Sequence, residues 1–105
     1  MKRGEVWWAN LPAPIGRRPV LLLSRDSMPA GRREITVAYL TSTIRQTPVE
    51  VPLLASRDGV PQDCVVNLDS INTIPKAALR SLICTLSAER MDEVKAAILV
   101  ALDLQ

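Results

Sequence analysis

The stretch Arg17–Ser24, "RRPVLLLS", places two arginines before a proline and continues into an apolar run of strand length. Such a run, bounded by loops, is typical of a β-strand that is buried on both faces. A clash with the ring of Pro19 pushes Arg18 out of helical geometry into an extended one. The guanidinium of Arg18 is therefore better aimed than one on a flexible loop. An aimed arginine indicates a binding site for a phosphate or a carboxylate.

Short strands are predicted on both sides of this run. In "GEVWWANL", residues 4–11, alternation puts Val6 and Trp8 on one face and Trp7 on the other. In "EITVAYLTS", residues 34–42, one face holds Ile35, Val37, Tyr39 and Thr41. Residues 49–54 are expected to form an edge strand, because Pro52 cannot donate a ladder hydrogen bond. Further strands are expected at residues 64–68, 70–74 and 80–86.

One good helix is predicted, at the C-terminal end. Ser87 is a favourable N-cap, and apolar residues then recur at helical spacing as Met91, Val94, Ile98 and Leu102. Residues 55–63 are expected to form a turn-rich loop and residues 75–79 a single helical turn. The chain of 105 residues is thus expected to be one domain, mainly β with helices, built on a small, strongly curved or barrel-like sheet.

The composition bounds the possible chemistry. Residues 1–50 carry eight Lys/Arg against four Asp/Glu, a basic half that points weakly to a polyanionic partner. The chain has no histidine, which excludes Ser-His and Cys-His catalysis and the usual imidazole ligands of zinc. Cys64 and Cys84 sit in apolar segments and are expected to be buried free thiols. Asp63 and Asp69 could form a carboxylate pair, although a surface role is favoured. No metal site and no cofactor are therefore expected.

Neither a membrane span nor a secretion signal is predicted. No apolar run approaches the roughly 20 residues that a spanning helix needs. The opening "MKRGEVWW" has two positive charges but no apolar signal region behind them. We therefore expect a cytoplasmic protein.

A hydroxyl cluster follows the strand at residues 34–42. The segment "LTSTIR", residues 40–45, contains Thr41, Ser42, Thr43 and Arg45. Such residues often only cap strand ends and begin turns. Together with Arg17 and Arg18 they suggest RNA cleavage, because RNA carries its own nucleophile, the 2′-hydroxyl beside each phosphate. The enzyme then needs to align that hydroxyl and to stabilise the charge on the phosphorane.

The order of these segments resembles the MazF/PemK family of bacterial toxins. The resemblance rests on "RGEVWWANL", "RRPVLLLSRD", "ITVAYLTST", "VEVPL", "DCVVNLDSINTI" and "LSAERMDEVKAAILVALDL", and covers nearly the whole chain. It implies one toxin domain over residues 1–105, an SH3-like small barrel of the PemK/CcdB type with a C-terminal helix. It also implies a homodimer, a cognate antitoxin, and sequence-specific, metal-independent cleavage of single-stranded RNA to 2′,3′-cyclic phosphate and 5′-hydroxyl ends.

The resemblance further implies roles for individual residues. Arg18 and Thr41 match the family's catalytic arginine and threonine, and the RNA is expected to be bound by Arg17, Ser42, Thr43, Arg45, Ser70 and Asn72. Two segments depart from the family. The short "PAPIG" replaces a longer loop before the arginines, and in "DSINT" Ser70 stands for a glutamine and Asn72 for an arginine. These departures should change the base preference or weaken the binding of RNA.

Two other readings remain open at the level of sequence. A non-catalytic toxin of the same fold could poison DNA gyrase by protein contact, and a plain barrel could bind RNA without cutting it. The paired presence of Arg18 and Thr41 favours the endoribonuclease. The placement of Trp7 and Trp8 on opposite faces also predicts a homodimer, because one large aromatic side chain would lie outside the barrel core.

Overall fold

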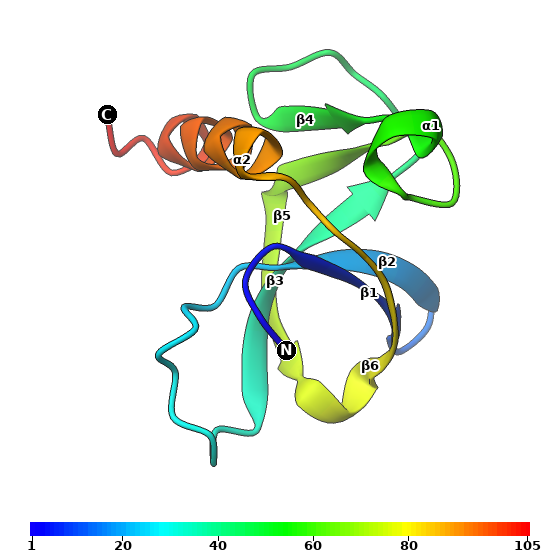
Figure 1. The fold of residues 1–105 in the computed structure, drawn as a ribbon, viewed down its shortest axis with the longest axis vertical. Coiled ribbons are helices and arrows are strands. Elements are labelled where there is room, and N and C mark those ends of the chain that lie inside the picture. The colour runs from blue at the N-terminus through cyan, green and yellow to red at the C-terminus, as the bar shows by residue number, and fades with distance from the viewer.

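The computed structural model describes residues 1–105 and contains one six-stranded antiparallel sheet in the order β4-β5-β3-β2-β1-β6. The strands are β1 Glu5–Asn10, β2 Arg17–Leu22, β3 Glu34–Thr41, β4 Glu50–Leu53, β5 Cys64–Pro75 and β6 Leu79–Thr85. The helices are α1 Ala55–Asp58, the 3-10 turn Lys76–Ala78 and α2 Ala88–Ala101. The sheet is strongly curved, and α2 lies beside β4 and β5 (Figure 1). This half-open barrel with a C-terminal helix confirms the predicted fold class.

Strand β2 is buried on both faces, as its apolar run predicts. Val20, Leu21 and Leu22 have no exposed surface. Leu21 belongs to one apolar core, whereas Val20 and Leu22 belong to a second core on the opposite face of the sheet. The strand begins earlier than the apolar run, however, because Arg17, Arg18 and Pro19 already pair with β1. Both arginines are thus held in a strand rather than in a loop.

The two cores confirm the predicted faces of β1 and β3. Val6 lies in the first core, with Ala38, Leu40 and the α2 residue Val94. Trp7 packs against the second core, as do Ile35, Val37 and Tyr39. Both faces of the sheet are therefore apolar. The second core covers Trp7 within this chain, so the tryptophan pattern alone does not require a partner subunit.

Strand β5 is a single strand, so the predicted pair of short strands at 64–68 and 70–74 is wrong. The pairing with β3 shifts between Ala38, opposite Ile71, and Tyr39, opposite Asn67, which leaves Leu68–Ser70 without partners on β3. The N–H of Leu68 donates to Val49 O at 2.9 Å, and that of Asp69 donates to Asn67 Oδ1 at 3.0 Å. The strand therefore bends here without ending, because its backbone donors find partners.

Residues 55–63 contain a helical turn where the sequence predicts only a loop. The N–H of Leu54 donates to Asp58 Oδ2 at 2.8 Å, and Gly59 ends the turn with a φ of 84°. Both features are local, but four residues are too few to form a stable helix in isolation, so the turn depends on the surrounding fold. The turn predicted at 75–79 is present as the 3-10 turn that links β5 to β6, although Pro75 itself belongs to β5.

Helix α2 begins where the sequence predicts. The Oγ of Ser87 accepts a hydrogen bond from the N–H of Arg90 at 3.1 Å, which is N-cap geometry. Met91, Val94 and Ile98 face the first core. Leu102 does not, because the helix ends at Ala101 and leaves that side chain 54% exposed. None of the helices has the length and apolar character that crossing a membrane requires.

Candidate functional site

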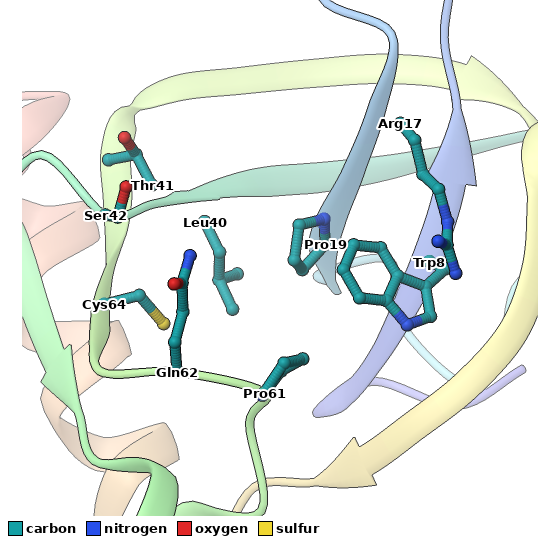
Figure 2. A pocket seen from close by; sticks show the side chains of 9 residues that line it. All are labelled: Trp8, Arg17, Pro19, Leu40, Thr41, Ser42, Pro61, Gln62 and Cys64. Carbon is teal, nitrogen blue, oxygen red and sulfur yellow. The ribbon is translucent and has the colours of Figure 1, made fainter.

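A pocket of about 230 Å³ opens where β1, β2 and β3 meet the segment after α1 (Figure 2). Its apolar lining consists of Trp8, Pro19, Leu40, Pro61 and Cys64. Its polar lining consists of Arg17, Thr41, Ser42 and Gln62. No carboxylate lines the pocket, so its one charged side chain is a cation. A pocket of this composition favours a ligand that is partly planar and apolar and carries negative charge nearby.

One wall of the pocket is a cation–π stack. Trp8 pairs with Pro19 in the β1–β2 ladder, and Arg17 lies two residues before Pro19 on the same face of β2. The Arg17 Cζ lies 4.1 Å from the centroid of the Trp8 ring, which is within the range of a cation–π contact. Arg17 is exposed and is engaged in no ion pair. Its guanidinium can therefore meet an anion while the indole holds it in place.

The hydroxyls lie on the opposite wall, at the end of β3 (Figure 2). The Oγ1 of Thr41 accepts a hydrogen bond from the N–H of Thr43 at 3.2 Å. A hydroxyl that accepts in this way still has its own proton to donate. Thr41 is half-buried and Ser42 is exposed, so both can reach a bound group.

Arg18 does not line this pocket. The pre-proline position restricts the backbone of Arg18, but the arginine that lines the pocket with Pro19 is Arg17. Alternate residues of a strand share a face, so Arg17 lies on the side of Pro19 and Arg18 on the other. The Arg18 Cζ lies 5.7 Å from the centroid of the Tyr39 ring, beside the second core.

The position of Thr41 relates it to both arginines of β2. Val20 pairs with Tyr39 in the β2–β3 ladder. Alternation along each strand then places both Arg18 and Thr41 on the sheet face of Val20 and Tyr39. Thr41 also lines the pocket that contains Arg17. Thr41 therefore shares a sheet face with Arg18 and lines the same pocket as Arg17.

The other predicted RNA-binding residues lie outside the pocket. Asn72 is opposite Val37 on β3, on the same face of the sheet as Tyr39 and Arg18. The Oγ of Ser70, in the irregular part of β5, accepts a hydrogen bond from Asn67 Nδ2 at 3.3 Å. These two residues are thus associated with the Arg18 face rather than with the Arg17 face.

Thr43 and Arg45 lie in the exposed segment that follows β3. The backbone N–H of Arg45 donates to Glu50 Oε1 at 3.1 Å, which holds this segment against β4. The guanidinium of Arg45 makes no ion pair. Thr43 contributes its backbone N–H to Thr41 but does not line the pocket.

Sequence reasoning missed two parts of the pocket, Trp8 as a lining residue and the segment Pro61–Gln62. The alternation in β1 places Trp8 on a face but does not reveal that Arg17 covers it. Gln62 stands in a turn-rich segment without any recognisable motif. No local signal could have identified Gln62, because its place depends on the packing of α1.

Cys64 is an inert member of the pocket lining. Burial raises the pKa of its thiol to about 11, with further contributions from the negative charges of Asp63, Cys84 and Asp58. The thiol is therefore neutral near pH 7 and is a poor nucleophile. No group of three or more Cys, Asp or Glu side chains in the chain could hold a metal ion. The reactive chemistry available at the site is that of arginine and hydroxyl groups.

Comparisons with known proteins match this architecture over nearly the whole chain. Probable endoribonuclease MazF2 of Mycobacterium tuberculosis is 44% identical over 93 residues, which cover 89% of each chain. The structure of Mycobacterium tuberculosis toxin MazF-mt6 superimposes with a TM-score of 0.86 at 34% identity, covering 96% of this chain and 98% of that one. An endoribonuclease in complex with its cognate antitoxin, from a mycobacterial species, gives a TM-score of 0.88 at 26% identity and covers 100% and 97%.

The family comparison agrees with these relatives. A model of the PemK-like, MazF-like toxins of type II toxin–antitoxin systems matches residues 2–102. The match includes β2 with its two arginines, the hydroxyls at the end of β3, and helix α2. The chain belongs to the PemK-like, MazF-like family of type II toxin–antitoxin toxins.

Proposed function

We propose that this protein is the endoribonuclease toxin of a toxin–antitoxin pair and that it cleaves single-stranded RNA at the junction of β2 and β3. The family and the endoribonuclease relatives support the activity. The observation that carries the location is the position of Thr41, which lines the pocket of Arg17 and lies on the same sheet face as Arg18 and Tyr39. A phosphate bound at this junction would have one arginine on each face of β2.

The chemistry starts from the RNA itself. The 2′-oxygen attacks the adjacent phosphorus and loses its proton, and the P–O5′ bond breaks as the 5′-oxygen gains a proton. The products are a 2′,3′-cyclic phosphate and a 5′-hydroxyl. An arginine remains charged at neutral pH and cannot relay these protons efficiently. We therefore assign the proton transfers to solvent and the stabilisation of charge to the protein.

Arg18 and Thr41 are the proposed catalytic residues. The sequence resemblance matches both to the family's catalytic positions, and alternation along β2 and β3 places them on the face of the Val20–Tyr39 pair. The planar guanidinium of Arg18 offers paired donors to the phosphorane oxygens. The hydroxyl of Thr41, oriented by the Thr43 N–H, has a proton to donate to the same phosphate. Arg17, Ser42, Thr43, Arg45, Ser70 and Asn72 are proposed to bind the RNA on either side.

The biological setting follows from the family. A relative of known structure is held in complex with its cognate antitoxin, so we propose an antitoxin protein as the natural inhibitor of this chain. We also propose a homodimer and a cytoplasmic location, where messenger RNA is available. Light scattering at micromolar concentration tests the dimer, and a monomer mass would contradict it.

The activity is tested by incubating a single-stranded RNA of mixed sequence with the purified protein in excess EDTA. We expect cleavage to continue without divalent metal, and we expect DNA of the same sequence to remain intact because it lacks the 2′-hydroxyl. Mass spectrometry of the fragments should show 2′,3′-cyclic phosphate ends. Intact RNA under these conditions would contradict the endoribonuclease assignment, and activity lost in EDTA but restored by magnesium would contradict the metal-independent mechanism.

A further inference from the structure

The pocket described above has the size and lining of a site for one planar ring system. Sites for whole small molecules commonly span roughly 300–1,000 Å³, and this pocket measures about 230 Å³. One wall is the stack of Arg17 on Trp8, and the floor between the walls includes Pro19 and Leu40 (Figure 2). Unpaired RNA bases stack on aromatic side chains and on arginine planes in this manner.

The wall opposite the stack contains Gln62, which is not engaged by the fold. Gln62 is exposed, and no hydrogen bond within the chain uses its amide, whereas the carboxylate of the adjacent Asp63 accepts from the Ala55 N–H at 2.9 Å. The side chain of Gln62 lies beside Cys64, on the side of the pocket that holds Thr41 and Ser42 (Figure 2). A primary amide offers donors and an acceptor side by side, the pattern that can match one edge of a nucleobase.

The segment that presents Gln62 is firmly anchored. Asp58 is paired with Arg90 of α2 at 3.0 Å, and it accepts from the Leu54 N–H. The Asp63 contact with Ala55 closes the other end of the segment. Pro61 restricts the backbone immediately before Gln62. A side chain on such a held segment loses little conformational freedom when it binds, which favours selective recognition.

We propose that this pocket holds one unpaired base of the RNA substrate, stacked on the Arg17–Trp8 wall, and that Gln62 reads its hydrogen-bonding edge. Gln62 is then a specificity-determining residue, distinct from the groups that act on the phosphate. A phosphate alone would not use the apolar floor, and an apolar ligand alone would not use the amide. This inference rests on the proposed function, because the base belongs to an RNA that is cut beside Thr41.

The test compares cut-site preference between two glutamine variants. Gln62→Met keeps the length of the side chain and removes its hydrogen bonds, while Gln105→Met makes the same change at the exposed C-terminal end. Each protein is incubated with a randomised single-stranded RNA, and the new 5′ ends are sequenced. We expect Gln62→Met to lose about tenfold or more of the base preference at one position, the size that one bidentate contact supplies. Gln105→Met should keep the wild-type preference and the wild-type rate.

A second measurement separates this inference from the proposed function. Tryptophan fluorescence is titrated with four 2′-deoxy tetranucleotides of single-base composition, which have no 2′-nucleophile. We expect a preference among the bases in the wild type and in Gln105→Met, and equal binding in Gln62→Met. If the wild type leaves RNA intact but shows this preference, the proposed function fails and the base pocket stands. If RNA is cut and Gln62→Met keeps the wild-type preference, or weakens cutting equally at every sequence, the inference about Gln62 is overturned.

Discussion

The guanidinium of Arg90 donates two hydrogen bonds to the carboxylate of Asp58, from Nε to Oδ1 at 3.0 Å and from Nη2 to Oδ2 at 3.2 Å. The two side chains are only 10% and 5% exposed. This pair fastens α1 to α2 across the end of the half-open barrel, and Gly59 and the pocket segment follow directly after it. It is the contact through which the C-terminal helix positions one wall of the site.

Removal of Arg90 should therefore destabilise the fold severely. Arg90→Ala leaves the Asp58 carboxylate buried without its partner, which costs about 3–5 kcal/mol of unfolding free energy in comparable pairs. The matched control is Arg57→Ala, because Arg57 pairs with Glu89 at 3.3 Å but both side chains are more than half exposed. That control should cost less than about 1 kcal/mol. Urea unfolding followed by circular dichroism measures both, and equal losses would show that the buried pair has no special role.

The same pair predicts a loss of stability in acid. Burial by itself raises the pKa of Asp58, but hydrogen bonds from Arg90 and from the Leu54 N–H outweigh burial and hold the pKa below its ordinary value. A carboxyl group with a lowered folded pKa stabilises the fold above its unfolded pKa of about 3.9 and loses that contribution as the pH falls further. The gap in unfolding free energy between the wild type and Asp58→Asn should hence be constant from pH 7 to 5 and narrow below pH 4. A gap that widens in acid would contradict a lowered pKa for Asp58 in the folded protein.

The two arginines of β2 should have different kinetic roles. Loss of the guanidinium in Arg18→Ala should reduce single-turnover cleavage at saturating enzyme about a hundredfold or more, equivalent to roughly 3–4 kcal/mol of transition-state stabilisation. Arg18→Lys should be nearly as damaging, because an ammonium group cannot form the bidentate contact. Thr41→Ala should slow the same cleavage step, though by less than Arg18→Ala does.

Arg17→Ala is the matched comparison on the opposite face of the strand. It should weaken the binding of RNA in a salt-dependent way and leave the chemical step nearly unchanged. Because Arg17 is the arginine that lines the pocket, the reverse result is informative. A folded Arg17→Ala that does not cleave, together with a normal Arg18→Ala, would place the catalytic arginine in the pocket.

Gly59 is required by its backbone conformation and by a close neighbour. Its φ is 84°, and a Cβ built on it would lie 3.1 Å from the Cβ of Cys84 on β6. Gly16 has a φ of 67° but no heavy atom within 4 Å of such a Cβ, so Gly16→Ala measures the conformational cost alone. We expect Gly16→Ala to cost about 1 kcal/mol, and Gly59→Ala to cost more. Equal shifts in thermal unfolding would show that the contact with Cys84 is unimportant.

The Cys64 thiol should react only at high pH. With its pKa at about 11, less than about one thiol in a thousand is ionised at pH 8, and the thiolate is the reactive form. In a Cys84→Ser background, alkylation by iodoacetamide should be slow at pH 8 and should rise about tenfold per pH unit up to pH 10. A plateau near pH 8.5 would indicate an ordinary exposed thiol.

Several features of this protein are determined by the sequence itself. The run after Pro19 predicts a strand buried on both faces, and Val20 and Leu21 are fully buried on opposite faces of the sheet. Ser87 predicts the start of α2, which is where the helix begins. These features are local, because the alternation of side chains along a strand and the capping of a helix depend on residues a few positions apart.

The assembly of the site is decided by contacts between distant segments. The packing of β2 beside β3 brings Arg17 and Thr41 to one pocket, and the Arg90–Asp58 pair spans 32 residues and anchors the turn before the segment that contains Gln62. The pre-proline position of Arg18 restricts its backbone, but it does not reveal which ring or hydroxyl the guanidinium meets. Strand register and buried ion pairs depend on packing between elements. Only the tertiary structure could therefore show that Arg17 stacks on Trp8 at the pocket while Arg18 lies over Tyr39 on the opposite face.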